Sequence, residues 1–392
     1  MGPSDELPFA FHIDSPRSGQ AVASTAVQIA GWVAMPSTER FEAPRLRVVS
    51  GAARELSLVR NDRPDVREVF PAHHVFGFNS LMHVSEVACG VDMVVIHEGD
   101  EYVVPVDVEV EEAVLREFDE RKAAKLDRIE PLLACSACGS ELGPRRDEVL
   151  ICPGCGVRVE RRDTCFDTLS EELRAEAGVV DTAHVSSHEY NRDVLEILDE
   201  HAEGLVLDAG CGFRTRYYPQ VVNLEVVAYP TTDVLGIGER LPFVDESFEA
   251  VLSLNVLEHL RDPFAAAIEL VRVTKRGGKI YAAVPFLQPY HGYPHHYFNM
   301  TREGLEGLFV DECEVIRSGV PKGGHPIASL RWFLDSYRRG LPAHTAERFT
   351  KLSVSDLLAD PTEQRDEAYV RQLSAEAQVE LASVNAVLAV RR

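Results

Sequence analysis

The sequence predicts a multidomain chain in which an α/β domain with a parallel sheet follows an all-β, sandwich-like domain and a small cysteine-bearing segment. Three observations predict it: early apolar residues alternate with period two, two Cys-x-x-Cys pairs follow, and later apolar strands alternate with helical patterns. A chain of 392 residues is too long for one ordinary core. We expect four segments: a β domain at 1–110, a connecting helix at 111–131, a metal-binding segment at 132–168 and the α/β domain at 169–392.

The composition narrows the partners of this chain. Its formal net charge is -23, and an acidic chain repels phosphate backbones, which weighs against a nucleic-acid partner without excluding one. No apolar run approaches the ~20 residues of a membrane helix, so no membrane partner is expected. Met1–Phe11 lacks the basic and apolar regions of a secretory signal, which predicts a cytoplasmic protein.

The first 110 residues contain short alternating segments separated by turn-rich stretches. This pattern is typical of a small sandwich, and its clearest strands are expected at 27–33, 46–49 and 93–96. The pieces Gly31-Trp32-Val33, Arg63-Pro64-Asp65-Val66 and Gly77-Phe78 resemble an accessory β domain attached to some bacterial sugar-modifying enzymes. The alternative, in which Trp32 and Phe78 are core residues, stays open.

Residues 111–129 contain no glycine or proline and are heavily charged, which predicts a helix that ends before Pro131. Glu112 precedes Arg116 by four residues, an order that stabilises a helix. Because charged residues cover this segment, we expect a solvated connecting helix rather than a binding surface.

Four of the eight cysteines form two pairs of the type Cys-x-x-Cys: Cys135 with Cys138, and Cys152 with Cys155. Thirteen residues separate the pairs, a spacing typical of a four-thiolate zinc site. Disulfides or a redox pair are the alternatives, but two such pairs in a chain without an export signal favour zinc. Strands are expected at 133–135 and 150–152, with a hairpin tip at 144–147.

From about Ser186 the sequence alternates short apolar strands with helices. Asp262 is expected to cap a helix that has Pro263 at its first position and runs to about Val273. Other helices are expected near 190–198, at 301–309 and across most of 327–377. Strands are expected at 205–207, 221–224, 232–235, 248–254, 279–284 and 314–316, with a last, antiparallel strand at 384–390.

Three stretches of this region form an ordered set: Val206-Leu207-Asp208-Ala209-Gly210-Cys211-Gly212, Leu241-Pro242-Phe243 with Ser247-Phe248, and Val256-Leu257-Glu258-His259-Leu260. In the first, an apolar strand ends in an acid and enters a glycine turn, which lets the backbone approach a ligand closely. Together they resemble the Rossmann-like, class I methyltransferases that depend on S-adenosylmethionine. The resemblance implies a Rossmann-like fold, S-adenosylmethionine as cofactor and methyl transfer as the reaction.

The resemblance also implies how the cofactor is held. Gly210 and Gly212 are expected beneath its methionyl part, and Asp208 is expected to accept from its ammonium group, directly or through water. Glu225 closes the next strand seventeen residues after Asp208, where one carboxylate suits both ribose hydroxyls. The alternative for both acids is an ordinary strand-end position.

Two places depart from the family pattern. Related enzymes often carry an acid in the stretch that reads Gly236-Ile237-Gly238-Glu239 here, so Ile237 and Gly238 are expected as pocket residues that pack on the adenine. Arg214 follows the glycine turn, where small residues are usual. It is expected to pair with the carboxylate of the cofactor or to be a solvated loop arginine.

The segment after the fourth strand is expected to contact the methionyl end of the cofactor. Asn255 ends that strand, and Leu257 and Glu258 follow it. By resemblance these residues line the site beside the sulfonium, and His259 is a positioning residue rather than a base.

The segment Pro285–Thr301 follows the fifth strand and is expected to rise over the carboxyl edge of the sheet. It holds three histidines and three tyrosines. A histidine titrates in the range that suits removal of a hydroxyl proton, so His291 and His295 are the candidates for a base or an acceptor contact. A structural cap over the pocket and a second metal site are the alternatives.

The predicted reaction is methyl transfer to an oxygen, or a nitrogen, of a small molecule or glycan precursor. Residues 132–168 also resemble the zinc ribbon that precedes the catalytic domain in some bacterial methyltransferases, including some that act on ribosomal RNA. The alternatives are therefore a ribosomal RNA methyltransferase whose ribbon arginines grip RNA, and a non-catalytic scaffold protein that binds the cofactor. Those arginines are Arg145, Arg146, Arg158, Arg161 and Arg162.

Overall fold

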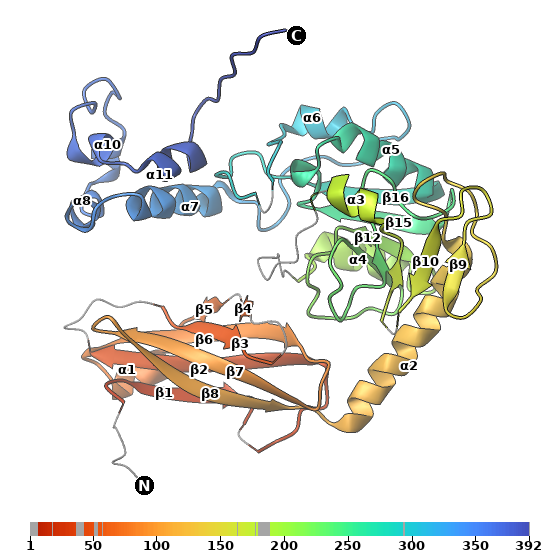
Figure 1. The fold of residues 1–392 in the computed structure, drawn as a ribbon. Helices are drawn as coiled ribbons and strands as arrows, with labels where there is room; N and C mark the ends of the chain where they lie inside the picture. The colour runs from red at the N-terminus through yellow and green to blue at the C-terminus, as the bar shows by residue number, and fades with distance from the viewer. Residues whose placement is uncertain are drawn as a thin grey trace.

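The computed structural model describes residues 7–391 except 18, 37–42, 51–53, 57, 163, 177, 179–188 and 293–294. A β-rich N-terminal region is followed by one long helix, an α/β region and a group of C-terminal helices (Figure 1). Among these described residues, no helix combines the length and the apolar character needed to cross a bilayer. The predicted start of the α/β pattern near Ser186 lies outside the described residues.

The N-terminal region contains two four-stranded sheets that share one hydrophobic core, so it is β-rich as predicted. Their strand orders are β1-β2-β6-β5 and β4-β3-β7-β8. Phe78 is 1% exposed and belongs to this core, whereas Trp32 is partly exposed and its ring lies tilted against Phe70, 5.6 Å between ring centres. The elements are β1 (Ala10–Ser15), β2 (Ala26–Pro36), β3 (Arg45–Val48), β4 (Arg54–Leu56), β5 (Val59–Asn61), α1 (Pro64–Val69), β6 (His73–His83), β7 (Ala88–His97) and β8 (Asp100–Glu109).

The connecting helix α2 (Glu112–Ile129) forms where it was predicted, but one face of its last two turns is buried. Lys122 and Lys125 are each 2% exposed. The Lys125 ammonium lies 2.9 Å from the Asp233 carboxylate, and Lys122 donates to the Thr232 carbonyl at 2.7 Å. The solvated-helix prediction is wrong because a lysine can enter a core when buried acceptors meet its ammonium group.

The α/β region is built on an eight-stranded sheet of order β16-β15-β12-β13-β14-β11-β10-β9. The five strands β12 to β16 run parallel, as a Rossmann-like fold requires. Their bounds are β12 (Val206–Ala209), β13 (Val221–Glu225), β14 (Val234–Leu235), β15 (Phe248–Leu254) and β16 (Thr274–Ala283).

Helices cover both faces of this sheet, so its central strands are buried on both sides. Val206 packs with α4 (Arg192–Glu200), whereas its neighbour Leu207 packs with α5 (Pro263–Val273) on the opposite face (Figure 1). Asp262 accepts from the Ala265 amide at 2.9 Å, which confirms the predicted cap of α5.

The cysteine-bearing segment extends the same sheet. It contributes β9 (Val149–Ile151), β10 (Arg158–Arg161) and β11 (Phe166–Asp167), and β11 runs parallel to β14. The strand predicted at 150–152 is therefore present in β9. The strand predicted at 133–135 is reduced to two isolated bridges, and the hairpin turn at 146–149 lies later than the predicted tip at 144–147.

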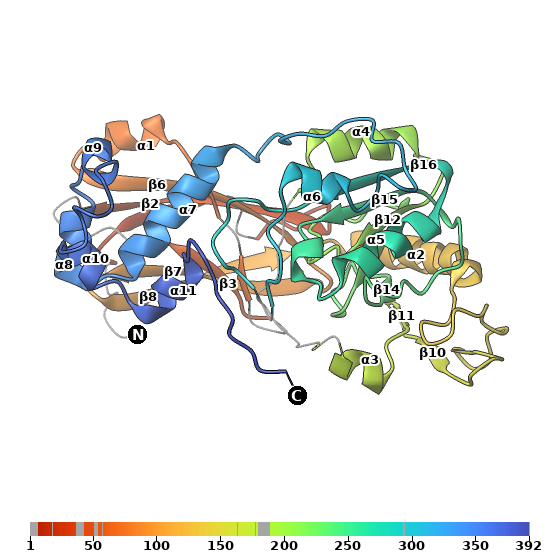
Figure 2. The same ribbon diagram turned by 90° about the horizontal axis from the view of Figure 1, so that it is seen from above.

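Two predicted strands are absent from the C-terminal part that the structure describes. Residues 314–316 and 384–390 are irregular and largely exposed, because a strand needs a hydrogen-bonded partner and the sheet ends at β16. The predicted helical stretch is confirmed and lies apart from the sheet (Figures 1 and 2). Its helices are α7 (Pro326–Arg339), α8 (Ala343–Phe349), α9 (Val354–Leu357), α10 (Ala368–Arg371) and α11 (Ala375–Glu380), and α6 (Arg302–Glu306) is shorter than predicted.

Candidate functional site

The glycine turn lies at the carboxyl end of β12 and is bound to the end of β13. Gly210 and Gly212 adopt φ values of 80° and 62°, a region that favours glycine. A Cβ on Gly210 would lie 2.6 Å from a methyl carbon of Val256, so no larger residue fits there. The Gly212 amide donates to the Glu225 carboxylate at 2.8 Å. The turn and the acid predicted to hold one cofactor are therefore in direct contact.

Glu225 occupies the last position of β13, where it accepts from two amides. One oxygen bonds the Gly212 amide, and the other bonds the Val226 amide at 2.7 Å. Burial raises the pKa of this carboxyl. Each carboxylate oxygen can accept a further hydrogen bond, so Glu225 remains able to bind a ligand hydroxyl.

Asp208 is fully buried within β12 and is held by two side chains. Its Oδ2 accepts from the Tyr190 hydroxyl at 2.6 Å and from Arg214 at 2.8 Å. Its Oδ1 is buried and has no hydrogen-bond partner among the residues that the structure describes. Asp208 was predicted to accept from the ammonium group of the cofactor. Its Oδ2 already accepts two hydrogen bonds from side chains, and its Oδ1 lacks a donor among the described residues.

Arg214 is not the solvated loop arginine that was one of its two predicted roles, and its contact with the carboxylate of the cofactor stays a prediction. It is 7% exposed, so it is not a solvated loop residue, and its charge is paired with Asp208. Its guanidinium lies 4.4 Å from the centre of the Tyr190 ring. The neighbouring carboxylate of Asp208 holds the pKa of Arg214 above its usual value despite burial. The sequence did not indicate this contact, because five residues that include the glycine turn lie between Asp208 and Arg214.

Ile237 and Gly238 lie beside an apolar cluster that the sequence did not predict. Ile237 is 6% exposed and packs with Leu169 and Leu173, which follow β11. A Cβ on Gly238 would lie 3.0 Å from the Leu260 side chain. Residues just after the cysteine-bearing segment therefore form part of the wall around Ile237.

The segment after β15 begins with Asn255, which adopts φ 55° and donates its amide to the Ala283 carbonyl at 2.8 Å. It continues into the short 3₁₀ helix η2 (Leu257–His259). Leu257 is 1% exposed. Glu258 is fully buried, both of its carboxylate oxygens lack a hydrogen-bond partner among the described residues, and burial raises its pKa to about 8.

The histidine-rich loop folds back onto η2. The Tyr297 amide donates to the backbone carbonyl of Glu258 at 2.7 Å, which fixes the loop at that point. The rings of His291 and His259 lie 5.3 Å apart. His295 is exposed and uses its carbonyl, 2.7 Å from the ring of His259. The structure thus brings His291 toward Glu258 and leaves the His295 ring outward; Tyr293 and Pro294 lie outside the described residues.

His296, in the same loop, and Trp332 also contact His291 and were not predicted as site residues. The centre of the His291 ring lies 4.2 Å from that of the His296 ring and 5.2 Å from that of the Trp332 ring in α7. Tyr290 donates its amide to the Glu380 carbonyl of α11 at 2.9 Å. His296 was visible in the same motif, but the contribution of the C-terminal helices requires tertiary packing.

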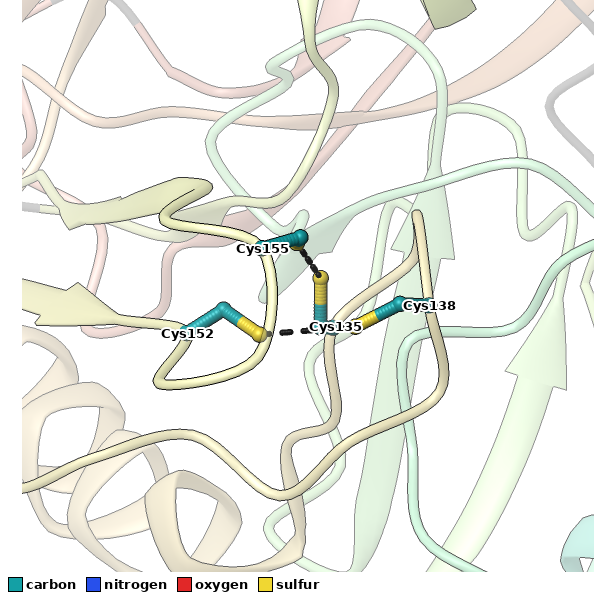
Figure 3. A group of neighbouring side chains, drawn as sticks. All are labelled: Cys135, Cys138, Cys152 and Cys155. Atoms are coloured by element: carbon teal, nitrogen blue, oxygen red, sulfur yellow. Dashed lines mark hydrogen bonds between the residues drawn. The ribbon is translucent and has the colours of Figure 1, made fainter.

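The four predicted metal ligands converge at the far end of the sheet (Figure 3). The sulfurs of Cys135 and Cys155 lie 3.5 Å apart, as do those of Cys138 and Cys152, and all four lie within 4.8 Å of one another. Tetrahedral thiolates at the usual zinc–sulfur distance of about 2.3 Å are about 3.8 Å apart. None of the cysteines forms a disulfide in the described part of the chain. The cluster is therefore compatible with a four-thiolate metal site.

Both Cys-x-x-Cys turns have the same backbone hydrogen bonds. The Gly139 amide donates to the Cys135 carbonyl at 2.8 Å, and the Gly156 amide donates to the Cys152 carbonyl at 2.9 Å. Each glycine has positive φ, 75° and 77°, which lets the chain curl beneath the sulfurs. The two similar turns each contribute two sulfurs, and the four sulfurs surround one common point.

Residues 207–282 match the family model described as a methyltransferase domain. An uncharacterized methyltransferase of Schizosaccharomyces pombe is 52% identical over 46 residues, which are 12% of this chain and 16% of that protein. An uncharacterized methyltransferase of a Mycobacterium species (strain JLS) is 42% identical over 61 residues, 15% of this chain and 24% of the relative. The chain thus spans less than a quarter of the length of these two relatives.

Among solved structures, the crystal structure of the cyclase SpnF overlaps with 45% of this chain and 79% of its own, at 18% identity and a TM-score of 0.29. The family-model match falls on the region from β12 to β16, where the glycine turn, Glu225 and Glu258 lie.

Proposed function

We propose that this chain transfers a methyl group from S-adenosylmethionine, bound at the carboxyl ends of β12, β13 and β15. The observation that carries the proposal is the contact of the Gly212 amide with Glu225, which binds the glycine turn of one strand to the acid that ends the next. The methyltransferase-domain match covers both residues.

The residues around the turn suit the parts of that cofactor. Asp208 has a buried Oδ1 without a donor, and the ammonium of the methionyl end is a suitable donor. Glu225 accepts from ribose hydroxyls in addition to its two amides. Ile237 presents an apolar side chain to the adenine ring, and the nearby Leu169 extends that wall.

The reaction requires mostly positioning. The bound cofactor supplies a methyl group on a sulfonium. An acceptor oxygen would attack the methyl carbon, the carbon–sulfur electron pair would go to sulfur, and the acceptor proton would pass to a base. Among the loop histidines, His291 is the better candidate for a contact with the acceptor, because it lies against η2 beside the proposed pocket whereas the His295 ring is exposed.

We propose a sugar, glycan precursor or other small hydroxyl compound as the acceptor. The net charge of -23 supports this choice over nucleic acid. Three of the five ribbon arginines support it as well: Arg145 lies 3.1 Å from Glu130, Arg161 pairs with Asp127, and Arg162 pairs with Asp167. Arginines neutralised by carboxylates of their own chain make a poor RNA surface.

We further propose that Cys135, Cys138, Cys152 and Cys155 hold one zinc ion with a structural role. Four cysteine ligands leave no open coordination position, which is typical of structural rather than catalytic zinc. The ion would join the two turns that flank β9 and stabilise the outer edge of the sheet.

Calorimetric titration of the full chain with S-adenosylhomocysteine tests the cofactor site. We expect micromolar binding that Glu225→Gln weakens about tenfold or more, because the neutral amide loses a charge-assisted hydrogen bond. Glu200→Gln, an exposed carboxylate on α4, is the matched control and should bind as the parent does. The absence of binding at millimolar ligand would instead favour the scaffold alternative with a degenerate site.

Incubation with S-adenosylmethionine and a panel of nucleotide sugars, read as a mass increase of one methylene unit, tests the acceptor. A shift on ribosomal RNA but on none of the sugars would contradict the proposed acceptor class.

A further inference from the structure

Three side chains with metal-binding atoms meet at the carboxyl end of β15. Glu258 and His259 come from η2, and His291 comes from the loop after β16. One ligand atom of each lies within 4.8 Å of the others, and the His259 Nε2 is 3.7 Å from a Glu258 oxygen. A metal ion about 2.1 Å from each ligand atom would draw such atoms together by small side-chain movements.

The buried, unpartnered carboxylate of Glu258 indicates that this site binds a ligand. Its side chain is 0% exposed, and neither carboxylate oxygen has a hydrogen-bond partner among the residues that the structure describes. Burial of a carboxylate without donors is costly, and natural proteins compensate for it with a cation or a metal. Two imidazoles on the same side make a metal the matching partner.

The backbone holds both histidines in the orientation that metal ligands have. The His259 Nδ1 lies 2.7 Å from the His295 carbonyl, and the His291 Nδ1 lies 2.8 Å from the Pro289 carbonyl. A carbonyl only accepts, so each Nδ1 carries the hydrogen and each Nε2 keeps its lone pair. Metal-bound histidines typically donate from their second nitrogen to a carbonyl in this way.

His296 differs from His259 and His291, because neither of its ring nitrogens is available to a metal. Its Nδ1 accepts from the His291 amide at 3.2 Å, and its Nε2 lies 3.0 Å from the Asn299 side-chain oxygen. Both ring nitrogens are occupied, so His296 supports the position of His291 and is not itself a ligand.

We propose that Glu258, His259 and His291 bind a divalent transition-metal ion. Two histidines and one carboxylate form a three-ligand set that leaves the other coordination positions to water or to an exogenous oxygen. This nitrogen and oxygen set differs from the four thiolates at the far edge of the sheet, so the two sites select different metals.

The position of the proposed metal site beside the glycine turn suggests a role in the reaction. Val256 directly precedes η2 and packs on Gly210, so the three ligands lie next to the glycine turn. If the chain transfers a methyl group there, as proposed above, an acceptor hydroxyl on the ion would lose its proton more readily and face the methyl donor. This assignment rests on the proposed function and narrows the acceptor atom to oxygen.

Titration of the full chain with Mn²⁺ alone, followed by electron paramagnetic resonance of free Mn²⁺, tests the site. Mn²⁺ prefers oxygen and nitrogen ligands to thiolates, so the cysteine cluster does not compete. We expect one saturable site, weakened about tenfold or more by Glu258→Gln, His259→Ala and His291→Ala. His295→Ala, in the same loop with an exposed ring, is the matched control and should retain the parent affinity.

Glu258→Gln could unfold the region. His291→Ala changes only a side chain in a loop, so its Mn²⁺ affinity still tests the site in that case. The metal site is overturned if the parent shows no saturable Mn²⁺ binding, or if His291→Ala binds Mn²⁺ as the parent does. The same samples are titrated with S-adenosylhomocysteine. Mn²⁺ binding without nucleoside binding would refute the methyltransferase proposal alone, and nucleoside binding without Mn²⁺ binding would refute the metal site alone.

Discussion

Arg214 donates a hydrogen bond from Nε to one oxygen of Asp208 at 2.8 Å, and its Nη2 forms an ion pair with the same oxygen, also at 2.8 Å. The second oxygen of that carboxylate stays buried without a partner among the described residues. The arginine therefore neutralises the acid that ends the first Rossmann strand without occupying the atom proposed to meet the cofactor. A residue that departs from the family pattern thus has a structural role beside the site.

Arg214→Met should destabilise the α/β region by about 3 kcal/mol or more, because it leaves the Asp208 carboxylate buried without its counter-charge. Thermal unfolding followed by circular dichroism measures the loss. Arg216→Met is the matched control, since Arg216 is exposed and its pair with Glu189 is worth about 1 kcal/mol or less.

A double variant, Asp208→Asn with Arg214→Met, should be less destabilised than the sum of its single changes. Additive losses would show that the two residues do not depend on each other and would contradict the pairing.

Gly210→Ala should abolish S-adenosylhomocysteine binding. The new methyl meets Val256 at 2.6 Å, in addition to the strain of a left-handed alanine. Gly277→Ala separates the two effects, because Gly277 has a similar φ of 77° but open space around its Cβ. It should cost only about 1–2 kcal/mol and leave binding unchanged. Equal effects of both changes in the binding assay would rule out the steric explanation.

Elemental analysis of the purified chain should find about one zinc ion per chain that is lost in Cys138→Ser and kept in Cys313→Ser. Cys313 is the control because it lies outside the four-cysteine cluster. In Cys138→Ser, backbone hydrogen exchange should be faster in β9 and β10, whereas β12 and β15 should stay protected, because the ion joins only the outer strands. A metal-free chain with protected β9 would contradict a structural zinc.

Stability should rise between about pH 8 and pH 10 through Lys125. Burial lowers the pKa of this ammonium to about 8, from 10.5 when the group is free. The unfolded chain therefore binds more protons in that window, so raising the pH favours the folded state, by up to about 3 kcal/mol. The measurement is the pH dependence of unfolding in urea, compared with Lys125→Met, which should lack this rise.

The rise belongs to Lys125 only if it disappears in that variant. An identical pH profile in the parent and in Lys125→Met would assign it to another group, such as Lys122, whose pKa burial also lowers.

The elements that the sequence determined by itself depend on local chemistry. The glycine turn after Asp208, the Asp262 cap of α5 and the two Cys-x-x-Cys turns each need only neighbouring residues and their allowed backbone angles. The period-two pattern likewise predicted the all-β region, because one face of each sheet lies on a core.

Tertiary structure alone decided which partners these elements meet. Residues 384–390 have a strand-like pattern but no neighbour to pair with, whereas β11 gains one by lying against β14. Lys125 is buried only because Asp233 and two carbonyls meet its ammonium, and Glu258 meets His291 only through the fold of a distant loop. Hydrogen bonds and ion pairs between distant residues depend on where the chain brings them together, and no local pattern contains that distance.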